Sequence, residues 1–291
     1  MRRHLPVQEL ARDDRFTWIH ESERFRDPRN GVQSNGNYQR TGKMTPKDPE
    51  GPERARSLMH GIFMGEVQAL EAAGRTCWDF DTSDDGRPSG KPSRPQGDAP
   101  PSQATDTAPF ALKLDMARQC WDESRHVEIS VKLADWMGTE IGEFAEGRGL
   151  YAAGCNRDPA LRLTAVNRGI EGLAIDVFAN MKTFAHECGD PVLEFCEDWM
   201  LADEVTHVKM GSDWLRRLTG DDPERQARAL EFQRVVDKIF AGAGRGDHEE
   251  YARKFRKMAG FTDDDIDEAH VPLAPEDDLA ARRRLVEGSR G

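Results

Sequence analysis

Apolar residues recur at spacings of three and four along four long stretches of the chain, which is the periodicity of helices with one buried face. These stretches run from about 53 to 75, 110 to 137, 158 to 185 and 190 to 220. The last two begin at Asp158-Pro159 and Asp190-Pro191, where a capping carboxylate precedes a proline at the first helical position. Two further helices are predicted at 223–240 and 248–258, and no segment of the sequence alternates as a strand would. The pattern therefore predicts an all-α protein.

The segments between these helices suggest how the chain is divided. We expect an N-terminal arm (1–52), a bundle domain (53–220), a C-terminal helical extension (221–272) and a flexible tail (273–291). The arm either wraps the core through its apolar residues Phe16, Trp18, Ile19 and Phe25 or is mobile. Residues 81–108 are rich in Pro, Gly, Ser and Asp, which predicts a disordered insert between the first two bundle helices. A long connection at 139–156 separates the second helix from the third.

The motif Asp-Glu-x-x-His occurs twice, at 122–126 and at 203–207, each time within a helical stretch. Residues three apart share a helix face, so Glu123 and His126 point the same way, as do Glu204 and His207. A carboxylate and an imidazole on one face supply part of a transition-metal site. Two such faces, with one more glutamate from each of two other helices, make up the ligand set of dinuclear carboxylate bundles.

Two further glutamates, Glu66 and Glu171, lie in the middle of apolar stripes on the first and third helices. A single Glu-x-x-His pair arises often by chance or as a salt link. Four carboxylates and two imidazoles on apolar faces are different, because burying them without a cation would cost much free energy. We therefore predict a metal site with these ligands: Glu66, Glu123, His126, Glu171, Glu204 and His207. The spacing leaves open which glutamates bridge the metals.

Several neighbouring residues are given supporting or structural roles. Asp122 and Asp203 lie about 100° around the helix from the adjacent glutamates, so we expect them to orient a ligand imidazole or to pair with Arg125. Asp176 is a weaker candidate for an extra ligand, and His60 is expected to cap a helix or to be exposed. The tryptophans in these helices are interpreted as packing residues: Trp121, Trp136, Trp199 and Trp214.

The composition limits the compartment and the partners. Of the 291 residues, 37% are hydrophobic and 32% are charged, and no apolar run approaches the roughly 18 residues that indicate a membrane span. Five cysteines without a C-x-x-C pair favour reduced thiols and a cytoplasmic location. A net charge of -12 disfavours a nucleic acid as partner.

The order Glu, Glu-x-x-His, Glu, Glu-x-x-His resembles that of the ferritin-like di-iron carboxylate superfamily, and residues 122–126 resemble the Asp-Glu-x-Arg-His signature of its oxygenase members. The resemblance covers residues 55–218 and is nearest to a ferritin-like family of unassigned function. It implies a four-helix bundle with a long crossover between its second and third helices, and oxygen chemistry at a metal pair.

The oxygen-rich ligand set suits Fe(II) or Mn(II) with open positions better than a structural zinc ion. We expect two iron ions, with manganese or a mixed Mn/Fe pair also compatible, and dioxygen as co-substrate. The favoured function is a di-iron oxidase or oxygenase that hydroxylates, N-oxygenates or desaturates a small-molecule metabolite. An external electron donor and a homodimeric assembly are both compatible with the sequence. The alternative is ferritin- or rubrerythrin-like iron oxidation or peroxide scavenging, and the absence of a C-x-x-C rubredoxin module disfavours the rubrerythrin version.

Overall fold

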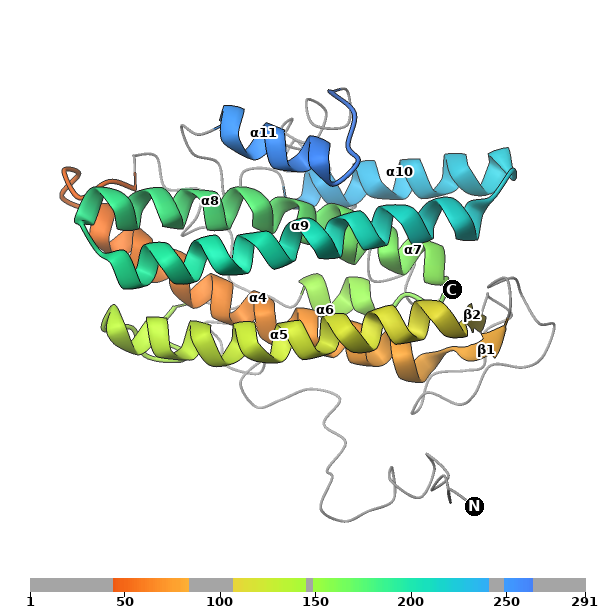
Figure 1. Ribbon diagram of the computed structural model, residues 1–291, viewed down its shortest axis with the longest axis horizontal. Coiled ribbons are helices and arrows are strands. Elements are labelled where there is room, and N and C mark those ends of the chain that lie inside the picture. Colours follow the sequence, from red (N-terminus) through yellow and green to blue (C-terminus); the bar gives the residue numbers. More distant parts are fainter. Residues whose placement is uncertain (1–43, 84–106, 145–148, 241–248, 264–291) are drawn as a thin grey trace, which may run out of the picture.

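The computed structural model describes residues 44–83, 107–144, 149–240 and 249–263, and this part of the chain is almost entirely helical (Figure 1). The longest helices are α4 (Gly51–Asp79), α5 (Phe110–Trp136), α8 (Glu171–Cys188) and α9 (Pro191–Thr219). The predicted all-α class is confirmed. None of the described helices is long and apolar enough to cross a membrane.

The long helices form two layers (Figure 1). In one layer α4 packs along α5, and in the other α8 packs along α9. The layers meet where α5 contacts α9 and α4 contacts α8. Two later helices, α10 (Pro223–Phe240) and α11 (Glu249–Met258), lie on the side of α8 and α9 that faces away from α4 and α5.

The aspartates that were expected to start two helices do so. The Asp158 side chain accepts a hydrogen bond from the Ala160 backbone N–H at 2.9 Å and caps the short helix α7 (Pro159–Leu163). The Asp190 side chain accepts bonds from the first backbone N–H groups of α9 at 3.1 and 3.0 Å. A capping carboxylate satisfies donors that the helix itself cannot use, which fixes where each helix begins.

The third helical stretch is not the single regular helix that its periodicity predicts. A π-helical segment, η1 (Thr164–Ile170), lies between α7 and α8. It packs closely on both sides: a Cβ built at Gly169 would lie 2.7 Å from Val236 of α10, and one at Gly211 of α9 would lie 2.3 Å from the Asn167 Cβ. π turns occur mostly as single insertions at functional sites. Periodicity over a window of residues does not reveal such an insertion, which explains the error.

Three smaller elements also depart from the prediction. Residues Asp81–Ser83 (β1) and Thr107–Pro109 (β2) form a two-stranded parallel pair, so the expectation of no strand and of a fully disordered 81–108 insert is wrong at the two ends of that insert. A short helix, α6 (Gly149–Gly154), lies within the predicted long connection. The remaining expectations for the arm, the insert and the tail fall on 1–43, 84–106 and 264–291, which lie outside the described residues.

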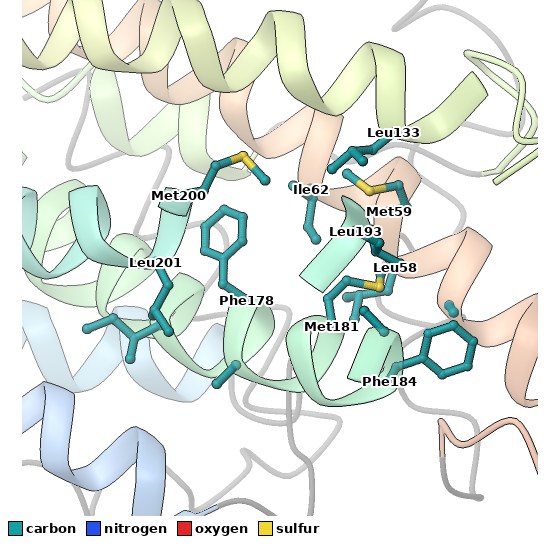
Figure 2. Packing of buried hydrophobic residues seen from close by; sticks show 14 of the residues in the cluster. Leu58, Met59, Ile62, Leu133, Phe178, Met181, Phe184, Leu193, Met200 and Leu201 are labelled. Carbon is teal, nitrogen blue, oxygen red and sulfur yellow. The ribbon is translucent and has the colours of Figure 1, made fainter. Parts of the chain in front are cut away.

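Two apolar clusters flank the middle of the long helices. One includes Leu133 of α5 and Leu193 of α9 and is drawn in Figure 2. The other includes Leu112 of α5 and Trp214 of α9. On α5, Glu123 and His126 lie between these two clusters, and on α9, Glu204 and His207 are flanked by their residues on both sides. The centre of the molecule is therefore a polar cluster enclosed by apolar side chains.

Candidate metal centre

All six predicted ligand residues are buried in the structure, and four elements supply them. Glu66 comes from α4, Glu123 and His126 from α5, Glu171 from the first position of α8, and Glu204 and His207 from α9. None of the six exposes more than 6% of its surface. Because the residues share no single helix, only the packing of both layers can bring them together.

The six residues form two overlapping groups whose candidate ligand atoms lie within 4.8 Å of one another. One group contains Glu66, Glu123, His126 and Glu204, and the other contains Glu123, Glu171 and His207. Glu123 belongs to both. We call these groups position one and position two.

The contacts of the two imidazoles distinguish central from lateral glutamates. His126 Nδ1 lies 3.1 Å from Glu66, 3.3 Å from Glu123 and 3.4 Å from Glu204. His207 Nδ1 lies 3.2 Å from Glu123 and 3.6 Å from Glu204. Glu123 and Glu204 therefore approach both imidazoles and occupy the centre, whereas Glu66 and Glu171 lie at opposite sides. Glu123 and Glu204, the glutamates of the two histidine motifs, are the carboxylates that would lie nearest to both imidazole-bound positions if two ions were held.

Each motif supports the histidine of the other motif. The Asp203 carboxylate lies 3.3 Å from Nε2 of His126, and the Asp122 carboxylate lies 3.4 Å from Nε2 of His207. Arg125 forms ion pairs with both aspartates. A carboxylate that accepts a bond from Nε2–H leaves the lone pair on Nδ1, which is the atom that faces the glutamates. The aspartates thus lie where the sequence placed them, behind the imidazoles.

The ionisable groups of the cluster change one another's pKa. Burial raises the pKa of Glu66 and of Glu171 well above the usual value of a glutamate. Burial also acts to raise the pKa of Glu123, but its contacts with His126 and His207 outweigh that effect and hold this pKa well below its usual range. Burial opposes charge on both imidazoles, yet the surrounding carboxylates raise the pKa of each. Without a metal the cluster retains protons, and binding a cation must displace them.

Two observations indicate that the cluster fits a metal ion. Glu123 Oε2 and His207 Nδ1 are buried and make no hydrogen bond, although each points into the cluster. Among the described residues, no ion pair joins a lysine or arginine to any of the four glutamates. Orphaned buried donors or acceptors are rare in native proteins and call for an explanation such as a bound ion. Carboxylate and imidazole side chains are common ligands of divalent metal ions.

Two buried amides lie beside the cluster, and no role was predicted for them. Gln119 of α5 donates hydrogen bonds to Glu171 and, at 3.2 Å, to Glu123. Asn167 of η1 donates to Glu171 at 2.9 Å and to the side-chain oxygen of Gln119 at 2.9 Å. Each amide lies four residues before a ligand, a spacing that is visible in the sequence but carries little weight without the structure.

A fifth buried carboxyl, Glu197, was also missed. Its side chain is fully buried on α9, and neither of its oxygens has a hydrogen-bond partner. Burial raises its pKa well above the usual value, and the negative charge of nearby Glu66 acts in the same direction. Glu197 precedes Glu204 by seven residues, which places both on the same helix face. That spacing was the available signal.

Several residues outside the cluster differ from expectation. His60 is buried, and its Nε2 accepts a hydrogen bond from the Gly142 backbone N–H at 2.9 Å, so it neither caps a helix nor faces solvent. Asp176 forms a buried ion pair with Arg256 of α11 at 2.6 Å. The prediction that Trp121 and Trp136 are packing residues is wrong, because they are 66% and 62% exposed. Trp214, by contrast, is buried as expected. All five cysteines are free thiols, as predicted.

The fold and the cluster together define an all-helical protein with a buried glutamate and histidine site that could hold a metal ion. Comparison with protein families gives a more particular assignment. The chain belongs to a family described as a protein of unknown function (DUF455), whose sequence pattern matches residues 5–267. No curated protein matches the chain, and no solved structure does.

Proposed function

We propose that the chain is a ferritin-like protein that binds two metal ions, iron or a manganese/iron pair, and uses dioxygen to oxidise a small metabolite. The observation that carries this proposal is the pair of overlapping ligand groups that share Glu123. Four carboxylates and two neutral imidazoles balance the charge of two divalent cations, which removes the cost of burying the acidic groups alone.

Each position would be built from residues of different elements. Position one would use Glu66, His126, Glu123 and Glu204, and position two would use Glu171 and His207 together with the shared Glu123. When bound, a pair of iron ions supplies the electrons that reduce dioxygen.

The rest of the site controls protons and water. Asp122 and Asp203 would hold each imidazole with its proton on Nε2, so that Nδ1 is free to bind. Apolar residues on both sides, such as Leu112 and Met200, exclude bulk water from the cluster. A dry site strengthens the electrostatic interactions within it and protects reactive species from side reactions.

The test begins with protein stripped of metal and reloaded with Fe(II) without oxygen. We expect two irons per chain, and on mixing with oxygenated buffer we expect oxygen uptake that scales with bound iron. Retention of no iron above background would contradict the proposal. Further rounds of Fe(II) and oxygen separate the alternative function: accumulation of many irons per chain indicates storage, whereas a constant two irons, with turnover only when a reductant and an organic substrate are added, indicates an oxidase or oxygenase.

A further inference from the structure

Glu171 differs from the other glutamates of the cluster because two neutral amides hold its carboxylate. Gln119 donates to one carboxylate oxygen and Asn167 donates to the other at 2.9 Å. By contrast, the oxygens of Glu66, Glu123 and Glu204 approach the imidazoles. The lateral glutamate of position two is therefore oriented by hydrogen bonds rather than by a histidine.

The amide pair forms a closed and internally consistent network. The second N–H of Asn167 bonds to the Gln119 side-chain oxygen at 2.9 Å, and the second N–H of Gln119 bonds to Glu123 at 3.2 Å. Both amide groups are buried to within 2% exposure. Ionised carboxylates only accept hydrogen bonds, so each amide must turn its nitrogen toward them. This requirement fixes the orientation of both amides.

The placement of Asn167 depends on the π-helical segment and on one glycine. Asn167 lies within η1, four residues before Glu171. Its Cβ faces Gly211 of α9, where a Cβ would lie 2.3 Å away, a separation that real side chains do not allow. The Asn167 amide reaches the Glu171 carboxylate because the two residues lie four apart on consecutive helical segments, and Gly211 leaves room for the Asn167 side chain against α9.

We infer that Gln119 and Asn167 are positioning residues for Glu171, and that Asn167, which contacts no position-one ligand, sets the metal affinity of position two while leaving position one unchanged. This inference rests on the proposed binding of two ions. The two amides hold the Glu171 side chain in one rotamer, because each donates to one of its carboxylate oxygens. The side chain therefore loses little conformational entropy when an ion binds. Without them the carboxylate is free to turn away, and partners of this kind typically contribute on the order of 10–100-fold to metal affinity.

The experiment is a calorimetric titration of metal-stripped protein with Mn(II), accompanied by a Co(II) titration that follows visible absorption. Asn167→Leu keeps nearly the same shape but removes both donors, and Asn167 does not contact a position-one ligand. The matched control is Asn156→Leu, because Asn156 is also buried but bonds to the Asp158 backbone N–H, far from the ligands. Asn167→Ala, with Asn156→Ala as its control, gives an independent variant if the first does not fold.

We expect wild-type protein to bind two ions. In Asn167→Leu the first ion should bind within about 2-fold of its wild-type affinity, and the second should bind on the order of 10–100-fold more weakly. The Co(II) absorption should change only for the second equivalent, and the control variants should match wild type. Equal weakening of both ions, or no weakening of the second, would overturn the inference. Failure of wild-type protein to bind any ion would instead contradict the proposed function.

Discussion

Each histidine of the cluster is oriented by an aspartate from the opposite helix, so α5 and α9 depend on each other at the level of single side chains. Asp203 reaches His126 and Asp122 reaches His207, while Arg125 joins the two aspartates. Two consecutive acidic residues thus have different tasks. The glutamate faces the centre, and the aspartate, about 100° further around the helix, reaches behind the neighbouring imidazole.

Replacing Glu123 tests whether the shared carboxylate is required for both ions. Glu123→Ala should reduce the metal content from two ions per chain to nearly none, because Glu123 belongs to both positions. Helix content by circular dichroism should stay unchanged, since the substitution favours a helix. Glu128→Ala is the control: Glu128 lies on the same helix, is exposed and pairs with Lys132. Retention of two ions in Glu123→Ala, measured by mass spectrometry of bound metal, would refute the assignment.

Glu197 should destabilise the metal-free protein as the pH rises. Its pKa in the folded state lies well above its ordinary value of 4.5, so above that pH the unfolded chain ionises first and gains stability relative to the folded one. Glu197→Met removes this effect. We expect the variant to gain about 1–3 kcal/mol of unfolding free energy at pH 8 and less at pH 5, where the native carboxyl is already neutral.

Urea unfolding with a chelator present measures this difference. Glu194→Met is the control on the same helix, because Glu194 is partly exposed and pairs with His186 near the surface; its effect should be within about 1 kcal/mol at both pH values. A loss of stability in Glu197→Met at pH 8 would show that the carboxyl has a stabilising partner and would contradict the prediction.

At the scale of elements, the π-helical segment η1 departs from the regular α-helices on either side of it. It interrupts the third helical stretch immediately before Glu171 and lies against α9 and α10 at Gly211 and Gly169. An extra residue in the turn shifts the residues after it around the helix axis. The direction of the Glu171 side chain is therefore set by the backbone of η1 as well as by the two amides.

Gly211→Ala should disrupt this contact. The added Cβ would clash with Asn167, and overpacking of this kind typically costs about 1–3 kcal/mol. Gly65→Ala is the matched control in α4, because a Cβ there meets nothing within 4 Å; a glycine replaced by alanine in a helix gains up to about 1 kcal/mol. Thermal melting should thus shift in opposite directions for the two variants. A stabilised Gly211→Ala would show that η1 and α9 are not closely packed.

At the scale of the whole molecule, the C-terminal helical segment contributes buried side chains to the apolar core. Ala259 and Phe261 follow α11 and belong to the same apolar cluster as residues of α4, α5, α8 and α9. Phe261 also stacks under the Arg168 guanidinium of η1, 4.4 Å from the ring centre. The family pattern extends to residue 267, beyond α11. This layer therefore supports the segment that carries Glu171.

The ion pair between Arg256 and Asp176 should contribute to the attachment of α11. Both side chains are nearly buried, with 5% and 10% exposure. Arg256→Met leaves a buried carboxylate without this partner and should cost about 3–5 kcal/mol. Arg253→Met is the control on the same helix, because its partner Asp263 is 59% exposed, and it should cost about 0–1 kcal/mol. Equal effects in denaturant melts would indicate that the buried pair adds nothing beyond a surface pair.

Much of the architecture was readable from local patterns. Asp158 and Asp190 cap the helices that they were predicted to start, because a cap acts on backbone groups within the next turn. The six candidate ligands were found because buried carboxylates and imidazoles interrupt apolar stripes at helical spacing. Glu197 lies seven residues before Glu204 and shares its helix face, but without a histidine three residues later that spacing alone does not separate it from a solvated glutamate.

The sequence by itself determined where the long helices lie, where the capped helices begin and that six polar side chains interrupt apolar helix faces, because each of these depends on spacing within one helix. Only the tertiary structure decided that Glu123 and Glu204 lie between both imidazoles, that each aspartate serves the opposite histidine, and that Gln119 and Asn167 meet at Glu171. These relations join separate helices. They depend on how far the helices are rotated and how closely they approach, and those quantities follow from the packing of the entire core.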